Sequence, residues 1–351
     1  MAYDTLSEVL RSVRLRGAVF YYVTGGGREW AAEAPPAREI AAAVMPGADH
    51  VMEYHVVTKG EAWAAVVGER PVRLAVGDIV MFPHGDTHVV SSAPGLRPAP
   101  ADTDWFIATA ADPKPIPISF LGADNPAVPE DVAAETVLVC GFLGCDMRPF
   151  NPLIATLPRL LHIPANGNGG WDAQVVRQAV RESQEQRPGS EAVLERLSEM
   201  MFVDAVRRYL DQLPHDSTGW LAGLRDDCVG KALAMMRERP GAAWTIETLS
   251  ARVGLSRSAL HERFVRYLDQ APMQYLSSWR MQVAANRLLQ SNDTIANIGM
   301  DLGYDSEAAF SRAFKRIVGS APSQWRRQRR AVAVSPNDAR RSDTGAPADG
   351  R

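Results

Sequence analysis

The stretch Gly77–His88 reads GDIVMFPHGDTH and contains side chains from which a metal site could be built. Imidazole nitrogens and carboxylate oxygens are common ligands of divalent transition metals, and two histidines with one carboxylate can hold such an ion. Glycine and proline are interleaved with these side chains, however, and both are typical of turns between strands. The stretch therefore either holds a metal for chemistry or builds part of a barrel that senses a ligand.

A second group of reactive side chains is the pair Cys140 and Cys145 in VLVCGFLGCDMRPF. Two thiols five positions apart could form a redox switch or supply soft ligands to a metal site. Free cysteines are also common as small buried hydrophobic residues, and that alternative stays open. The chain has three cysteines in total, too few for a disulfide framework, which favours a reducing compartment.

Short runs of β-branched and aromatic residues, separated by Gly, Pro and Asp, occupy residues 17–120. Runs such as AVFYYVT and HVMEYHVV are typical of strands, so an antiparallel barrel or sandwich is expected. From residue 151 to 214 the pattern becomes helical. Leu194, Leu197 and Met201 share one face of the helix after the break at 188–190. This stripe is either a dimer seam or the face that packs on the barrel.

The C-terminal part contains an internal repeat, TIETLSARVGLSRSALHERF at 245–264 and TIANIGMDLGYDSEAAFSRAF at 294–314. In each copy a small residue lies four positions before a turn glycine, which lets two helices cross closely in helix-turn-helix geometry. A polar residue after each turn caps the next helix, and a long helix over 273–290 connects the copies. The small residues and glycines are Ser250, Gly254, Gly299 and Gly303; the caps are Ser256 and either Asp305 or Ser306; the inward anchors are Leu260, Phe264, Phe310 and Phe314.

The net charge of -3 is unevenly distributed. Residues 225–330 contain 17 Lys and Arg against 10 Asp and Glu, whereas the preceding residues contain 18 against 28. A basic C-terminal part predicts a polyanionic partner for that end alone. No apolar run is long enough to span a membrane, and the polar N-terminus is unlike a secretory signal, so a cytoplasmic protein is expected.

Residues 226–329 resemble the DNA-binding domain of the AraC/XylS family of bacterial transcriptional regulators, most specifically in GYDSEAAFSRAFKRIVGSAPSQWRR. The resemblance implies two recognition helices, Arg257–Tyr267 and Ser306–Val318, in successive major grooves of DNA. Carried over by position, the base-reading residues are Ser258, His261 and Glu262 in the first helix and Glu307, Ala308 and Arg312 in the second. An arginine can donate two hydrogen bonds to guanine, and a glutamate can accept one from cytosine. The residues expected to contact phosphates, or to lie as charges at the core edge, are Arg257, Arg263, Arg280, Lys315 and Arg316.

The stretch Gly77–His88 resembles the second motif of the cupin barrel, G-x5-P-x-G-x2-H. The upstream cupin motif, H-x-H-x3-E-x6-G, matches at His55 and Glu61 but has Val57 in place of its second histidine. The resemblance implies that His55, Glu61 and His88 converge inside the barrel. There they bind an effector or, less favoured because one ligand is missing, a metal ion. The residues expected to shape the turns are Gly77, Pro83 and Gly85.

The predicted fold is multi-domain, with α and β parts. A cupin-like antiparallel β-barrel occupies 1–150, a helical linker and dimerisation region 151–217, an all-α double helix-turn-helix domain 218–330, and a disordered tail 331–351. The predicted function is a sequence-specific DNA-binding transcriptional regulator controlled by a small molecule, and not an enzyme. Expected partners are double-stranded promoter DNA, the effector, RNA polymerase if the protein activates, and a second copy of the chain. No cofactor is required, and no membrane is involved.

The alternative function is a metal-dependent cupin enzyme with a helical appendage. Val57 argues against it, because a catalytic metal site needs the full ligand set.

Overall fold

The structure is a computed structural model that describes residues 5–121, 134–165, 178, 181–182, 185, 187–214 and 216–329. The chain divides into two compact units. The barrel unit contains Val13–Asp146 and Pro152–His215, and the helical unit contains Met1–Ser12, Met147–Asn151 and Asp216–Arg351. The predicted boundaries at 150 and 217 therefore differ from the observed ones. The tail predicted at 331–351 lies outside the described residues.

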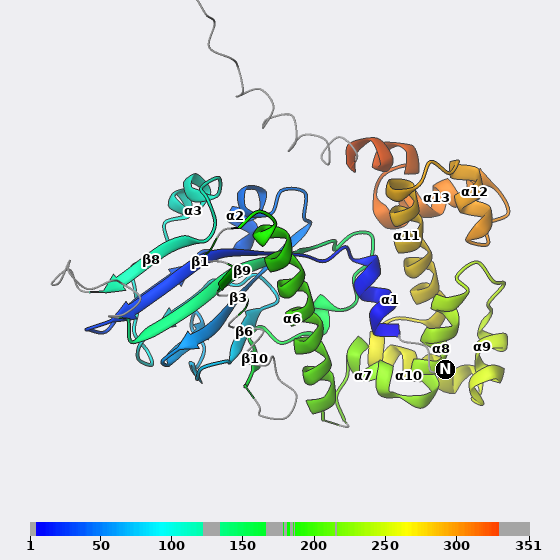
Figure 1. Ribbon diagram of the computed structural model, residues 1–351. Helices are drawn as coiled ribbons and strands as arrows, with labels where there is room; N and C mark the ends of the chain where they lie inside the picture. The colour runs from blue at the N-terminus through cyan, green and yellow to red at the C-terminus, as the bar shows by residue number, and fades with distance from the viewer. Residues whose placement is uncertain are drawn as a thin grey trace, which may run out of the picture. The chain divides into compact units, whose positions relative to one another are not determined.

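The barrel unit is built from two sheets whose apolar side chains meet between them. The six-stranded sheet has the order β10-β6-β3-β9-β1-β8, and the four-stranded sheet has the order β2-β7-β4-β5 (Figure 1). The strands are β1 (Arg16–Gly26), β2 (Ala31–Ala34), β3 (His50–Lys59), β4 (Ala62–Val66), β5 (Val72–Leu74), β6 (Ile79–Phe82), β7 (His88–Ser91), β8 (Ile116–Leu121), β9 (Thr136–Cys145) and β10 (Leu161–Ile163). The short helices of this unit are α2 (Ala37–Val44), α3 (Thr103–Thr109) and the 3-10 turn η1 (Ile154–Thr156).

One strand pair departs from the predicted antiparallel arrangement. Strands β1 and β8 run parallel, with Tyr21 opposite Ile116, whereas the other described pairs are antiparallel. A parallel pair needs a crossover connection, and the chain between β1 and β8 is long enough because it contains the second sheet and α3. The prediction of an antiparallel barrel is corrected at this edge.

Helix α6 (Ser190–Gln212) packs on β1 and belongs to the barrel unit (Figure 1). All three residues of the predicted apolar stripe on this helix are buried or half-buried. The Tyr54 hydroxyl of β3 lies 2.7 Å from the Ser198 hydroxyl of α6. Gly17 in β1 permits the close approach, since a Cβ there would clash with the Ser198 side chain. The stripe therefore packs on the chain's own barrel and is not free to form a dimer seam.

The helical unit contains two helix-turn-helix hairpins, α9-α10 and α12-α13, joined by α11. Their first helices are followed by Gly254 and Gly303 in the left-handed region, at φ +75° and +80°. The side chains of Ser256 and Ser306 cap the second helices, which settles the alternative between Asp305 and Ser306. The helices of this unit are α1 (Thr5–Ser12), α7 (Trp220–Arg225), α8 (Asp227–Glu238), α9 (Ile246–Val253), α10 (Arg257–Leu268), α11 (Pro272–Gln290), α12 (Ile295–Asp301) and α13 (Glu307–Val318), with 322–329 also helical.

Two segments from the N-terminal half belong to the helical unit because α11 satisfies their backbone groups. The buried Gln282 side chain donates to the carbonyl of Ser12, at the end of α1, at 2.8 Å. The Gln282 side-chain oxygen accepts from the N–H of Phe150 at 2.9 Å, and Asn286 also donates to the Ser12 carbonyl at 2.8 Å. Carbonyls at a helix end lack partners within the helix, so these contacts fix α1 in place. We call the Gln282 contacts to Ser12 and Phe150 the Gln282 clamp.

Candidate functional site

The first recognition helix, α10, presents one apolar and one polar face. Leu260 and Phe264 are buried in the helical unit, whereas Ser258, His261 and Glu262 are exposed. These positions follow the helical period, so the three polar side chains share the face away from the core. Helix α10 ends at Leu268, one residue beyond the predicted end.

The second recognition helix, α13, has the same arrangement. Phe310 and Phe314 are buried, and Glu307, Ala308 and Arg312 are exposed. Two further basic side chains in the last turn, Lys315 and Arg316, are also exposed. Both helices therefore present to solvent the residues that the sequence assigns to base reading.

The basic residues predicted to contact phosphates lie in different environments. Arg257 is exposed and pairs with Glu247 at 3.0 Å. Arg263 pairs at 3.0 Å with Asp226, the residue that caps α8. Both guanidinium groups remain largely at the surface.

Of the two roles expected for Arg280, a phosphate contact or a charge at the core edge, its contacts are those of the second. Its Nε donates to the carbonyl of Pro240 at 2.7 Å and its Nη2 to that of Ala242 at 2.9 Å. The guanidinium also lies 5.8 Å from the centre of the Tyr304 ring, and burial lowers the pKa of Arg280. These contacts hold the 240–242 turn against α11. The observed role of Arg280 is therefore to support the fold, and a DNA phosphate would have to compete with two carbonyls for it.

A buried polar cluster lies between the two sheets of the barrel. Glu53 and His55 are two positions apart on β3, so their side chains leave the same face of the strand. His88 begins β7 in the facing sheet, and all three side chains are buried. His55 Nε2 lies 2.7 Å from His88 Nε2, and His88 Nε2 lies 3.6 Å from Glu53 Oε2. The structure thus brings His55 and His88 together.

The prediction that Glu61 faces this cluster is wrong. Glu61 follows Gly60, which has a φ of +72° at the end of β3, so it lies beyond the strand that carries His55. Its exposed carboxylate accepts hydrogen bonds from the guanidinium of Arg73, with Nε at 3.1 Å. Glu53 is the acid that the fold places beside the histidines.

The hydrogen bonds of the cluster determine which ring nitrogens of His55 and His88 carry a proton. His88 Nδ1 lies 3.0 Å from the Asp86 carbonyl, which can only accept, so Nδ1 carries the proton. His88 Nε2 is then an acceptor, and His55 Nε2 donates to it. His55 Nδ1 is left with a lone pair that has no partner among the described residues. Burial lowers the pKa of His88 to about 4 and that of His55 well below 6.5, so both rings are neutral at pH 7.

Glu53 completes the cluster as a carboxyl group, and no cation of the described residues lies beside it. Burial raises the pKa of Glu53 well above 4.5, which favours the protonated form. Its Oε1 also lacks a hydrogen-bond partner among the described residues. The cluster therefore contains two polar atoms, Glu53 Oε1 and His55 Nδ1, that have no hydrogen-bond partner among the described residues. They belong to residues two positions apart on β3.

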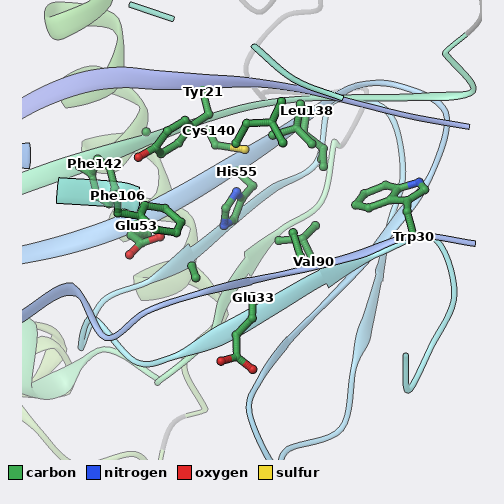
Figure 2. A pocket seen from close by; sticks show the side chains of 15 residues that line it. Tyr21, Trp30, Glu33, Glu53, His55, Val90, Phe106, Leu138, Cys140 and Phe142 are labelled. Atoms are coloured by element: carbon green, nitrogen blue, oxygen red, sulfur yellow. The ribbon is translucent and has the colours of Figure 1, made fainter. Parts of the chain in front are cut away.

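Two members of the cluster, Glu53 and His55, line a cavity of about 60 Å³ between the sheets (Figure 2). Its walls are largely aromatic and aliphatic, as Figure 2 shows for Tyr21, Trp30, Phe106 and Phe142. The polar tips that reach it include Glu53 and His55. An apolar cavity with few convergent polar groups is the usual form of a small-molecule site.

The other polar residues of the stretch Gly77–His88 build the barrel. Asp78 accepts from the backbone N–H groups of Ala75 and Ala165, and Asp86 pairs with Arg159. Gly77 and Gly85 adopt positive φ angles in the turns. Of this stretch, only His88 belongs to the buried cluster.

The cluster has the composition of a two-histidine, one-carboxylate metal site. One donor atom from each of Glu53, His55 and His88 lies within 4.8 Å of the others. The two ring nitrogens, however, are hydrogen-bonded to each other at 2.7 Å, whereas two nitrogens on one zinc ion would lie roughly 3.3 Å apart. The residues fit a metal only if this hydrogen bond breaks and the rings separate.

Comparison with known proteins identifies both parts of the chain. The cupin family model matches residues 4–211, and a helix-turn-helix domain model matches residues 249–328. An AraC-like transcription regulator of Streptomyces lividans is 31% identical over 92% of this chain and 98% of its own length. The chain belongs to the AraC-like transcription regulators. A second such regulator, from Streptomyces antibioticus, is 29% identical over the same share of each chain, and AlkR, an HTH-type transcriptional regulator of Acinetobacter baylyi, is 28% identical over 93% of this chain and 99% of its own.

This AraC-like regulator is thus a DNA-binding transcriptional regulator with a cupin domain at its N-terminal end, which confirms the predicted family, fold class and function. Val57, at the position of the missing cupin histidine, is fully buried in the apolar core of the barrel. None of the helices in the described part of the chain is long and apolar enough to cross a membrane.

The two cysteines of the predicted redox pair do not meet in this AraC-like regulator. They lie within β9, a central strand of the six-stranded sheet. Because they are five positions apart on one strand, they point to opposite faces. Cys140 lines the cavity, and burial raises the pKa of both thiols, which disfavours the reactive thiolate. The arrangement agrees with the interpretation of Cys140 and Cys145 as buried hydrophobic residues.

Two functional residues escaped the sequence analysis. Glu53 could have been found from strand alternation, because it precedes His55 by two positions on a predicted strand. Gln282 gave no such signal, since its partners lie 132 and 270 positions away along the chain.

Proposed function

We propose that this AraC-like regulator is controlled by a small organic effector that binds in the barrel cavity, and that it has no enzymatic activity. The observation that supports this most directly is the pair of buried, unpartnered polar atoms, Glu53 Oε1 and His55 Nδ1, on the wall of an apolar cavity. Buried polar groups normally have partners, and a ligand in the cavity could supply them. The proposal requires no cofactor.

The DNA-reading surface in this proposal consists of the exposed faces of α10 and α13. Ser258, His261 and Glu262 read one half of the site, and Glu307, Ala308 and Arg312 read the other. Phosphates are contacted by Arg257, Arg263, Lys315 and Arg316. A helix-turn-helix motif reads bases with the exposed face of its second helix, and these faces are free of core contacts.

Two partners follow from this function. If the regulator activates, RNA polymerase is one of them. Homodimerisation would pair half-sites on promoter DNA, and its seam is expected outside the Leu194 stripe, because Leu194 and Met201 are buried. The mass of the purified protein in solution, with and without operator DNA, tests the dimer.

The test of effector control uses the operator found by mapping genomic binding sites. A reporter on this operator is titrated with candidate inducers for the wild type, His55→Ala and His88→Ala. Both variants should lose induction, while the affinity of the effector-free proteins for operator stays within about a factor of three (~0.7 kcal/mol). Normal induction by both variants would show that the effector binds elsewhere.

A metal-responsive regulator is the second candidate, favoured by the donor set of Glu53, His55 and His88. Its discriminating measurement is the metal content of protein purified without chelators. A stoichiometric metal that is lost in both histidine variants would favour this candidate over an organic effector.

A further inference from the structure

The polar atoms of the barrel cavity define the hydrogen bonds that an occupant must offer. His55 Nδ1 can only accept, because His55 Nε2 donates to His88. Glu53 Oε1 belongs to a carboxyl group that can donate or accept according to its proton. Tyr21 Oη also lacks a hydrogen bond of normal geometry, although the Thr109 side chain is a polar neighbour. An occupant that fits must therefore carry a donor for His55.

The charges around the cavity limit the occupant further. None of the described residues that line it is Lys or Arg, and the ionisable acids among them are Glu33 and Glu53. An anion would be buried without a counter-ion, which is costly in an apolar site. A cation would have to draw the proton from Glu53 and be desolvated with it. An uncharged occupant meets neither penalty.

The walls of the cavity limit the size and shape of the occupant. A volume of about 60 Å³ is smaller than the roughly 150 Å³ of an engineered apolar cavity that binds benzene. A single ring therefore enters only if one wall moves. Phe106 comes from α3, a helix with no buried residue, and it faces the interior beside Glu53 (Figure 2). Because none of its residues is buried, α3 is the wall that we expect to shift at least cost.

We propose that the cavity binds an uncharged, ring-sized apolar molecule bearing a hydroxyl or N–H group, which donates a hydrogen bond to His55 Nδ1 and forms a second one with Glu53. The inference rests on the proposed function and adds the chemical class of the effector. A hydroxyl serves both contacts, because its hydrogen is donated and its oxygen accepts. An ether or a hydrocarbon of equal size leaves His55 Nδ1 unpaired.

The class is tested with four single-ring probes on the full-length protein. Phenol is the uncharged donor, anisole lacks the donor hydrogen, benzoate is the anion, and benzylamine is the cation. Calorimetric titration should show phenol binding at least about tenfold more tightly than the other three (~1.4 kcal/mol). The thermal unfolding temperature of the protein should rise with phenol concentration.

Substitutions at His55 and Glu53 test which side chains form the hydrogen bonds to phenol. His55→Phe keeps a flat ring but removes the acceptor, so the advantage of phenol over anisole should disappear. Glu53→Gln should retain it, because an amide both donates and accepts. His261→Ala, a change on the exposed face of α10, is the matched control and should bind phenol as the wild type does.

Three outcomes would overturn the proposal. Tighter binding of benzoate or benzylamine than of phenol would contradict an uncharged occupant. Equal binding of phenol and anisole would contradict the donor to His55. Stabilisation by Zn²⁺ with none by phenol would assign the cluster to a metal.

Failure of the proposed function and failure of the proposed chemical class would give different results. If phenol does not bind but His55→Phe still abolishes induction of the reporter, the chemical class is wrong and effector control stands. If phenol binds through His55 but His55→Phe induces normally, the class of occupant stands and the cavity does not control transcription.

Discussion

Glu53 is a buried carboxyl group with no cation beside it in the part of the chain that the structure describes, and its raised pKa makes the stability of the barrel depend on pH. The pKa of Glu53 is raised in the folded protein, so above pH 4.5 the unfolded chain releases a proton that the folded chain retains. Folding then becomes less favourable as the pH rises, until the folded carboxyl also ionises. The loss is about 1.4 kcal/mol for each unit by which the pKa is raised.

Glu53→Gln should therefore stabilise the barrel unit at neutral pH, by an amount that grows from pH 4.5 upward. The free energy of unfolding in urea, measured at several pH values, is the readout. Glu61→Gln is the control, and at this exposed position we expect a change below about 0.5 kcal/mol. An unchanged or less stable Glu53→Gln protein at pH 8 would mean that the carboxylate has a partner.

Two arginines of the helical unit should behave oppositely when changed to alanine. Arg280→Ala leaves the carbonyls of Pro240 and Ala242 without their donor and should cost about 1–3 kcal/mol of stability. Arg312→Ala removes an exposed side chain and should leave stability within about 0.5 kcal/mol. It should instead weaken operator binding by about 1–3 kcal/mol and relax preference at one base pair.

Unfolding and DNA titrations of the same two proteins provide the check. Equal loss of operator and random DNA binding by Arg312→Ala would exclude base reading. Full stability of Arg280→Ala would exclude the structural role.

At the scale of elements, the helical hairpins could be predicted almost to the residue because their signals are local. The cap Ser256, the left-handed Gly254 and the anchors Leu260 and Phe264 all lie within one short segment. The barrel was predictable as a set of strands, but its parallel edge was not, because β8 finds β1 across most of the unit. Packing between distant segments also explains the wrong choice of Glu61. The motif spacing pointed to Glu61, whereas the burial of Glu53 depends on the sheet that faces β3.

The repeat also predicts how its two copies differ in packing. Gly299 faces Phe310, and a Cβ at Gly299 would lie 2.8 Å from the Phe310 Cβ. The first copy has Ser250 and Leu260 at the corresponding positions. Gly299→Ser alone should therefore destabilise the helical unit by about 1–3 kcal/mol through overpacking.

Adding Phe310→Leu should recover part of that loss, since the pair then matches the first copy. A double-mutant cycle of unfolding free energies measures the coupling. Strictly additive effects would show that the two positions do not share the contact.

At the scale of the whole molecule, the Gln282 clamp holds two segments of the helical unit that continue along the chain into the barrel unit. Strands β1 and β9 both line the barrel cavity, through Tyr21 and Cys140. The chain continues from β1 back to Ser12 and from β9 on to Phe150, and Gln282 bonds both. We therefore expect a ligand-dependent shift of either strand to be felt, through the chain, at α11, the helix between the two helix-turn-helix hairpins.

Gln282→Leu should uncouple effector from DNA. We expect the variant to bind phenol, or the natural effector, as the wild type does, and to bind operator DNA with an affinity that no longer depends on effector. Gln290→Leu, on the exposed end of the same helix, is the matched control. The measurement is operator affinity with and without effector, alongside an unfolding curve. Retention of the effector response by Gln282→Leu would show that coupling runs through other contacts.

The docking of α1 in the helical unit also implies an order of events during protein synthesis. Thr5 and Ser12 leave the ribosome before their partners Arg237 and Gln282, which follow 232 and 270 positions later. At about 5–20 residues per second, α1 waits on the order of 10–50 s for its docking site. Its buried Leu6 and Val9 are exposed meanwhile, while the barrel can already fold. The nascent chain is thus open to chaperones at α1 until the helices that cover it are made.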